Sequence, residues 1–172
     1  MKKALLILLA LSALLAGLFA QRWFATGNGI GAKLEAVFPD LEGKPHDLAE
    51  WKGRVVIVNF WATWCPPCVE EMPEFVKLQR ELGPKGVQFV GILTDDEADA
   101  AREFLQAMPL NYPVLNGEAG GRLWAEKLGD KAGVLPYSAV FDPTGKLIHA
   151  EAGRFTRDEV LRIVMPLANQ GH

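Results

Sequence analysis

Long apolar runs alternate with amphipathic stretches along most of the chain. Residues 54–61 (RVVIVNFW) and 87–94 (VQFVGILT) are continuous β-branched and aromatic runs, the pattern of central strands buried on both faces of a sheet. Helical patterning follows each run, over about residues 67–82 and 97–107, and ends at Gly-Pro or Pro. We therefore expect parallel strands joined by helices.

Weaker signals complete the predicted sheet. Short strands are expected at residues 34–38, 44–48, 112–115, 138–141 and 147–151, and helices at 122–128 and 157–168. Glu42-Gly43 and the segment from Asp142 to Gly145 suit tight turns, so the first two and the last two strands should form hairpins. Asp95 and Asp96 are expected to cap the helix that follows them. The pattern predicts an α/β fold, with a central mixed β-sheet flanked by helices on both faces.

The N-terminus has a different pattern. Lys2 and Lys3 precede 17 uninterrupted apolar or small residues, 4–20, as in the first two regions of an export signal. Because the end of this run lacks a full A-x-A cleavage site, we favour an uncleaved signal-anchor over residues 1–24, with a cleaved signal peptide as the alternative. Glycine-rich residues 25–33 are expected to be a linker and residues 34–172 the domain. Either alternative places the domain in the bacterial cell envelope, on the periplasmic side, where disulfides form.

Composition narrows the class of protein. The 172 residues are 49% hydrophobic and 23% charged, which suits one domain of about 150 residues with a substantial core. A net charge of −3 with interspersed signs provides no basic stripe for nucleic acid. No G-x-G-x-x-G follows a predicted strand, so we expect no nicotinamide or flavin cofactor.

The only two cysteines, Cys65 and Cys68, lie three residues apart. A disulfide closing so small a loop stabilises a fold by only roughly 2 kcal/mol, so chemistry is the better explanation. Cys65 lies between a buried strand and a helix, where unpaired N–H groups and the helix dipole favour a thiolate. Pro66 and Pro67 suit a first helical turn. We therefore assign Cys65 as the attacking sulfur and Cys68, one turn further along, as the shielded resolving sulfur.

The segment VNFWATWCPPCVEEMP, residues 58–73, resembles the active-site segment of the thioredoxin-like superfamily. Specifically, it is similar to that of the TlpA/ResA-like membrane-anchored thiol-disulfide reductases. The likeness covers about residues 34–167, with a β-hairpin before the first long strand and residues 98–115 matching the central helix-strand insertion of that branch. It implies a thioredoxin-like fold.

The resemblance also assigns the surroundings of the cysteines. Pro136 stands where the family carries a cis-proline facing the disulfide, whereas the sequence pattern alone would predict an ordinary trans proline. Tyr137 departs from the small hydroxyl residue often found after that proline. The expected rim of the substrate site consists of Trp64, Pro66, Pro67, Leu135 and Tyr137.

A proton acceptor for the resolving thiol is expected at Glu71. Thioredoxin has a buried aspartate beneath its cysteines, but the matching residue here is Asn59, whose amide cannot accept a proton. Glu71 lies three residues after Cys68 and hence on nearly the same helix face, and it matches the acidic residue of the TlpA/ResA branch. The alternative is a solvated glutamate that only complements the helix dipole.

Other kinds of site fit less well. Zinc requires about four ligands, and His46, His149 and His172 are scattered, so we expect no metal. A peroxiredoxin has a Thr-x-x-Cys pattern, whereas Thr63 is only two residues before the first cysteine. A non-catalytic anchored domain that binds an exported client stays open.

We therefore expect a thiol-disulfide oxidoreductase with no cofactor beyond the redox-active Cys65–Cys68 pair. Oxidases of the superfamily often carry a histidine between the cysteines, and Pro66-Pro67 offers no such charge. A reductase is favoured on this ground, with a disulfide oxidase as the alternative. The resemblance implies an exported disulfide-containing protein, such as an apocytochrome c, as substrate. A membrane thiol reductant is the expected electron donor.

Overall fold

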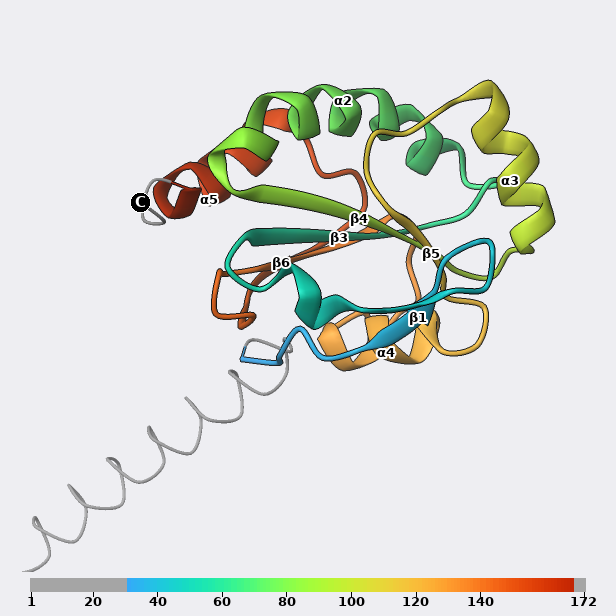
Figure 1. Ribbon diagram of the computed structural model, residues 1–172, viewed down its shortest axis with the longest axis horizontal. Coiled ribbons are helices and arrows are strands. Elements are labelled where there is room, and N and C mark those ends of the chain that lie inside the picture. The colour runs from blue at the N-terminus through green and yellow to red at the C-terminus, as the bar shows by residue number, and fades with distance from the viewer. Residues whose placement is uncertain (1–30, 169–172) are drawn as a thin grey trace, which may run out of the picture.

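The computed structural model describes residues 31–168, and these form a five-stranded mixed sheet with helices on both faces (Figure 1). The strands are β3 (Val55–Trp61), β4 (Val87–Leu93), β5 (Val114–Asn116), β6 (Tyr137–Phe141) and β7 (Leu147–Ala152), in the order β5-β4-β3-β6-β7. The β3, β4 and β5 strands are parallel, whereas β6 is antiparallel to β3, and β7 is antiparallel to β6.

The two long apolar runs form the centre of the sheet, as predicted. Every residue of β3 and β4 is buried, because strands covered by helices on both faces have no solvent side. Across the sheet, Asn59 of β3 lies opposite Gly91 of β4 on one side and Ser138 of β6 on the other. The first polar side chain of the active site is thus fixed at the middle of the sheet.

Helices cover both faces of the sheet. They are α2 (Pro66–Leu82), α3 (Ala98–Ala107), α4 (Gly121–Leu128) and α5 (Arg157–Ala168), with 3-10 turns η1 (Leu48–Trp51) and η2 (Gly83–Lys85). Helices α2 and α5 lie on one face, and α4 lies on the other beside the hairpin of β1 (Val37–Pro39) and β2 (Pro45–Asp47) (Figure 1). Helix α3 and β5 form the predicted insertion, with β5 at the sheet edge.

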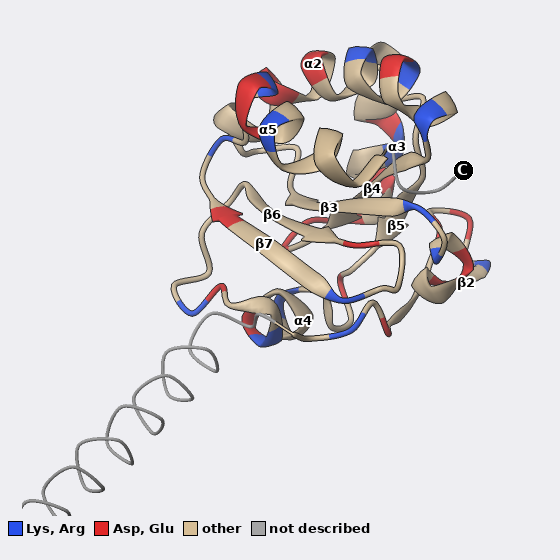
Figure 2. Ribbon diagram, turned by 90° about the vertical axis from the view of Figure 1, so that its left-hand side faces the viewer, with Lys and Arg blue, Asp and Glu red and all other residues tan. Residues whose placement is uncertain are grey.

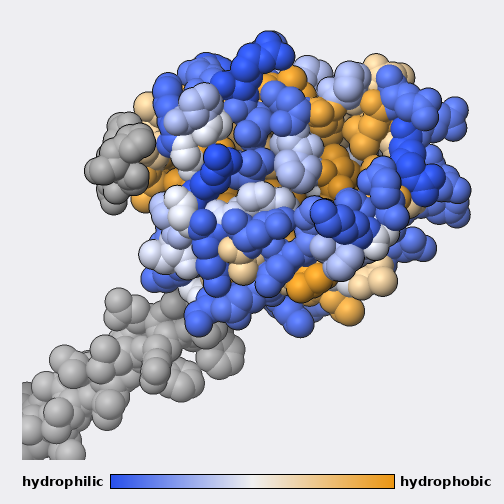
Figure 3. Space-filling view, viewed as in Figure 1, coloured by the Kyte–Doolittle hydropathy of each residue, from blue (hydrophilic) through white to orange (hydrophobic). Residues whose placement is uncertain are grey.

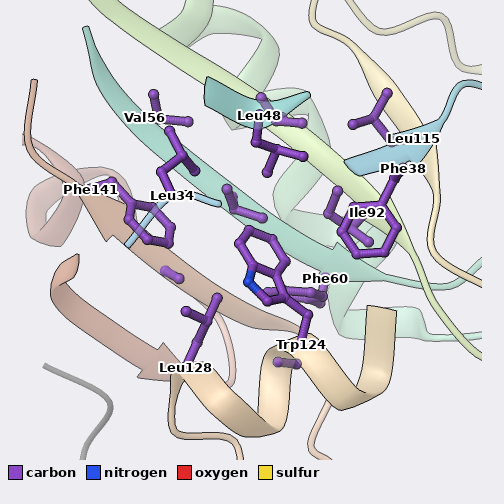
Figure 4. Packing of buried hydrophobic residues seen from close by; sticks show 14 of the residues in the cluster. Leu34, Phe38, Leu48, Val56, Phe60, Ile92, Leu115, Trp124, Leu128 and Phe141 are labelled. Atoms are coloured by element: carbon purple, nitrogen blue, oxygen red, sulfur yellow. The ribbon is translucent and has the colours of Figure 1, made fainter. Parts of the chain in front are cut away.

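An aromatic cluster joins α4 to the sheet. The indole of Trp124 lies 5.6 Å from the ring of Phe60, 5.7 Å from Phe38 and 6.1 Å from Phe141, measured between centroids (Figure 4). Aromatic rings at such spacings add about 0.5–1.5 kcal/mol per pair beyond the burial of apolar area. The sheet face covered by α4 is therefore filled by a packed apolar core. The two cysteines lie at the start of α2, on the opposite face of the sheet.

The predictions for the last helix, for the cap of α3 and for the N-terminal anchor have different outcomes. The last helix has the predicted bounds, 157–168. The predicted cap by Asp95 and Asp96 is wrong for α3: Glu97 is the N-cap residue and no side chain caps the helix. The predicted anchor, 1–24, and most of the linker lie outside the described residues. Of the helices in residues 31–168, none has the length and hydrophobicity needed to cross a membrane.

The surface in the view of Figure 3 is mostly hydrophilic, and apolar atoms show mainly between α2 and α3. A groove of about 280 Å³ is lined by Leu105, Leu110 and Val114 among others. These residues also pack against the apolar cluster that holds both cysteines. The insertion thus closes one side of the active site.

Candidate active site

The two cysteines form a disulfide at the start of α2. Cys65 is the N-cap residue of the helix, and Pro66 and Pro67 are its first two residues. Of the two cysteines, Cys68 is fully buried, whereas Cys65 keeps 3% of its surface exposed. An incoming thiolate or disulfide therefore reaches Cys65 first, which agrees with its assignment as the attacking sulfur.

The start of α2 provides fewer hydrogen-bond donors than the sequence suggested. Proline has no N–H, so the first two helical positions, Pro66 and Pro67, donate nothing. The next two N–H groups, of Cys68 and Val69, both donate to the carbonyl oxygen of Cys65, at 3.1 and 3.2 Å. The prediction that unpaired N–H groups converge on the Cys65 sulfur is therefore wrong for these four positions. The helix dipole remains as a source of positive potential.

The peptide bond between Leu135 and Pro136 is cis, as the resemblance implies. The side chain of Leu135 packs against the apolar cluster that contains Cys65 and Cys68. No hydrogen bond joins the backbone of Leu135 to another of residues 31–168. The cis-proline segment therefore lies beside the disulfide and offers one free backbone donor and acceptor to an extended chain.

Four of the five side chains predicted for the rim are at least partly exposed. Trp64 is 60% exposed, Pro66 is exposed, and Pro67 and Leu135 are half-buried. The prediction for Tyr137 is wrong. Its side chain is buried against Phe60, and its hydroxyl donates to the carbonyl oxygen of Leu128 at 3.0 Å.

The side chain of Tyr137 points away from the cysteines because residues of a strand alternate between the two sheet faces. Burial raises the pKa of Tyr137 to about 12, and the charge of Asp130 acts in the same direction. This phenol stays neutral at physiological pH and serves the core. The sequence did not indicate the face because the strand is buried throughout.

Glu71 is buried beneath the start of α2, with only 4% of its surface exposed. One carboxylate oxygen accepts a hydrogen bond from Asn59 Nδ2 at 2.8 Å, and the other accepts from the backbone N–H of Phe155 at 2.9 Å. The alternative of a solvated glutamate is therefore wrong. Burial raises the pKa of Glu71 from 4.5 to about 7, although both hydrogen bonds and the charge of Arg154 oppose this rise.

A carboxyl with a pKa near 7 exchanges a proton readily at neutral pH. Asn59 positions it: the same Nδ2 that donates to Glu71 also lies 3.1 Å from Ser138 Oγ. In the sequence, Asn59 is recognisable only as a substitute for an aspartate. No local pattern indicates Ser138 or Phe155, because their roles depend on contacts between residues 79 and 84 positions apart along the chain.

A second support lies at the end of β4. Asp96 Oδ2 accepts from both the backbone N–H and the hydroxyl of Thr63, each at 2.6 Å. The backbone carbonyl oxygen of Asp95 accepts a hydrogen bond from Trp64 Nε1 at 2.9 Å. The side-chain carboxylate of Asp95 forms an ion pair with Arg122 at 2.6 Å. The two aspartates therefore hold the loop before Cys65 in place.

Asp95 has a φ of 55°, a left-handed conformation that aspartate tolerates better than most residues do. The signal in the sequence was an Asp-Asp pair directly after a buried strand parallel to the strand that leads to the cysteines. The same pair of residues would serve equally as a cap for the next helix or as a support for the loop before Cys65, so the sequence does not distinguish these two roles.

No group of three or more His, Cys, Asp or Glu side chains within residues 31–168 could hold a metal ion. His46 lies within hydrogen-bond distance of Asp40 and Glu50, and His149 within that of Glu151. Both histidines thus have carboxylate partners close by in the sequence. His172 lies outside the described residues.

Sequence comparisons identify relatives over most of the chain. The model of the Redoxin family matches residues 30–163. A curated relative, the thiol-disulfide oxidoreductase ResA of Bacillus cereus, is 32% identical over 160 residues, which cover 90% of this chain and 89% of the relative.

Solved structures give the same result. A thiol:disulfide interchange protein of the thioredoxin family from Chlorobium tepidum has a TM-score of 0.71 and 28% identity, covering 81% of this chain and 96% of that chain. A secreted thiol-disulfide isomerase from Corynebacterium glutamicum has a TM-score of 0.73 and 26% identity, and the match covers 80% of this chain and 86% of that chain. The fold is therefore thioredoxin-like.

Proposed function

The chain belongs to the Redoxin family and is a thioredoxin-like, ResA/TlpA-type thiol-disulfide oxidoreductase, and from this premise we propose that it works as a reductase of disulfides in exported proteins. The observation that carries the proposal is the Cys65–Cys68 disulfide at the first turn of α2, with the buried Glu71 three residues after Cys68 on the same helix. The electrons pass through these two sulfurs, with no other cofactor.

The reaction has two thiol-disulfide exchanges. The Cys65 thiolate attacks one sulfur of the client disulfide, forms a mixed disulfide and releases the other client sulfur as a thiolate. Glu71 then takes the proton from the Cys68 thiol, and the Cys68 thiolate attacks the Cys65 sulfur. The bond between the two cysteines forms, the second client thiolate leaves, and two electrons have moved to the client.

The direction of electron flow is argued from the start of α2. A strongly oxidising pair is one whose thiolate form is stabilised. Here Pro66 and Pro67 supply neither a positive charge nor an N–H, and the N–H groups of Cys68 and Val69 are directed to a backbone carbonyl. The thiolate of Cys65 is therefore stabilised less than in oxidases with a histidine in this loop, which supports reduction.

The proposed client is an exported protein with a C-x-x-C disulfide, such as an apocytochrome c before haem attachment. An exported location is supported by the relative from Corynebacterium, which is described as secreted, and by the apolar N-terminal run. In this proposal residues 1–24 hold the domain at the periplasmic side of the membrane. A membrane thiol reductant then returns electrons to the oxidised pair.

A complementation experiment tests catalysis against client binding without chemistry. In a strain that lacks the protein, the wild-type chain should restore mature cytochrome c, and a Cys65→Ala, Cys68→Ala double variant should not. Purified protein, reduced beforehand, should also reduce a C-x-x-C-H peptide disulfide. Complementation by the double variant would show that binding alone suffices and would overturn the proposal.

Trp64 is expected to contribute to client affinity. A Trp64→Ala variant should lower kcat/KM for the peptide disulfide by about 5- to 10-fold, because an exposed aromatic side chain at a recognition site contributes about 1 kcal/mol or more. Steady-state kinetics checks this. The matched control is Leu123→Ala, another exposed apolar residue (66%) that lies on α4, away from the cysteines. Equal effects of the two variants would remove Trp64 from the client site.

A further inference from the structure

A cleft of about 410 Å³ lies between α2 and the segment that joins β7 to α5. Its charged lining residues are Glu70, Glu71, Glu74, Lys77, Arg154 and Arg157. Glu71 is the buried member of this set, so it lies at the inner end of the cleft. None of the lining residues belongs to the rim defined by Trp64 and the cis-proline segment.

Ion pairs surround the outer part of the cleft. Arg154 Nη1 lies 2.9 Å from Glu70 Oε2, and both side chains are more than half exposed. Arg157 instead bonds Glu74 at 3.1 Å and Glu81 at 2.6 Å. Figure 2 shows that both α2 and α5 carry acidic and basic residues. Of the cleft cations, Arg154 is the one whose charge acts on Glu71.

If Glu71 acts as the proton acceptor in the proposed function, it needs a path by which it exchanges its proton with solvent. Each turnover requires it to accept a proton from Cys68 and to lose that proton before the next one. In the mixed disulfide, the client covers Trp64 and the backbone of Leu135, so water is excluded from that face. The cleft opens elsewhere and stays accessible.

We propose that this cleft is the route by which Glu71 exchanges its proton with solvent while a client is bound, and that Arg154, paired with Glu70 at its mouth, favours the charged form of Glu71. Arg154 is then a positioning residue, which acts through Glu71 and not on the sulfurs. The proton leaves Cys68, passes to Glu71 and goes to solvent through the cleft. The electron pair of the Cys68 sulfur meanwhile forms the bond to the Cys65 sulfur, the bond between Cys65 and the client sulfur breaks, and that sulfur leaves as a thiolate.

The titratable and charged groups around Glu71, and the amide that binds it, are included in this proposal. They are Glu70, Glu74 and Lys77 on α2, Arg154 before α5, Arg157 on α5, Asn59 on β3 and Tyr112 before β5. The Tyr112 hydroxyl is buried and has no hydrogen-bond partner within residues 31–168. Its pKa is raised by burial first and by the charge of Glu71 second, so it stays neutral and adds no charge.

The test is a titration of the Glu71 carboxyl by ¹³C NMR in the full-length oxidised protein, where the disulfide cysteines do not titrate. A Glu71→Gln spectrum identifies the signal. Arg154→Gln should raise the midpoint by a few tenths to about one pH unit, because it removes a positive charge and leaves Glu70 unpaired. Glu70→Gln should lower the midpoint. Arg157→Gln, the matched control, should leave it in place.

A second titration tests the route itself. A full-length Cys68→Ser variant is joined through Cys65 to a single-cysteine peptide, and Glu71 should still titrate in this mixed disulfide. Loss of the titration there, or equal shifts in Arg154→Gln and Arg157→Gln, would overturn the inference. If Glu71→Gln leaves the exchange rate unchanged, the proposed proton step itself fails. If Glu71→Gln slows exchange but Arg154 and Glu70 have no effect, only the role of the cleft fails.

Discussion

A Cys65→Ser variant is expected to lose disulfide exchange almost completely, with kcat/KM lower by about 10³-fold or more. Cys65 is the N-cap residue of α2 and the one residue of the pair with exposed surface. A serine hydroxyl stays protonated at neutral pH and cannot form a mixed disulfide. The loss should appear in the kinetics of peptide disulfide reduction.

A Cys68→Ser variant separates the two sulfurs. It keeps the attacking thiolate but lacks the resolving sulfur, so it should form the mixed disulfide once and then stop. Mass spectrometry of the protein after incubation with the peptide disulfide detects that adduct. An adduct that accumulates in Cys65→Ser and not in Cys68→Ser would reverse the assigned roles.

A Glu71→Gln variant is expected to resolve the mixed disulfide about 10- to 100-fold more slowly at neutral pH, the usual contribution of a positioned proton acceptor. Glutamine keeps the shape but accepts no proton from Cys68. In the wild-type protein the rate should rise with pH through about 7, because Glu71 must be ionised to accept a proton. Stopped-flow kinetics of both proteins should show the rise near pH 7 in the wild type, whereas Glu71→Gln should speed up only at the higher pH where a thiol ionises unaided, near its ordinary pKa of about 8.5.

The raised pKa of Glu71 also predicts a change in stability with pH. Between its unfolded pKa near 4.5 and its folded value of about 7, the folded protein binds more protons than the unfolded chain. The contribution of Glu71 to stability is therefore complete below about pH 4.5 and is lost as pH rises through 7. The loss is on the order of 3 kcal/mol.

Urea unfolding of the wild-type protein and of Glu71→Gln, at several pH values between 4 and 8, measures this difference. The wild-type free energy of unfolding should decline relative to that of the variant over this range. Glu81→Gln changes an exposed position on the same helix and is the control for both Glu71 experiments. It should change the rate of disulfide exchange by less than about twofold, and its stability should follow the same pH dependence as that of the wild type. A parallel pH dependence in the wild type and Glu71→Gln would show that Glu71 ionises normally.

The elements that the sequence predicted best are those whose pattern has a single local explanation. The runs at 54–61 and 87–94 are too apolar for any position except the sheet centre, and the strands that they form, β3 and β4, are buried throughout. Helix 157–168 has acidic residues in its first turn, and its bounds agree with the prediction. The cis peptide bond at Pro136 came from the resemblance, because local pattern favours trans.

The errors come from contacts that local pattern does not contain. Asp95 and Asp96 bind the loop before the cysteines and Arg122, and within α3 itself neither caps an N–H group, although Asp96 also accepts from the N–H of the N-cap residue Glu97. Tyr137 faces the core because of strand alternation within a fully buried strand. For Asp95, Asp96 and Tyr137, tertiary packing and not the local sequence thus determines which groups the side chain contacts.

The reduction potential of the Cys65/Cys68 couple tests the central claim of a reductase most directly. The full-length protein is equilibrated in thiol/disulfide buffers, and its redox state is followed by the fluorescence of Trp64, which lies next to Cys65. A potential near or below that of thioredoxin, about −270 mV, is the result that the account predicts. A potential near −120 mV, typical of a strong oxidant, would contradict it and make this protein a disulfide donor.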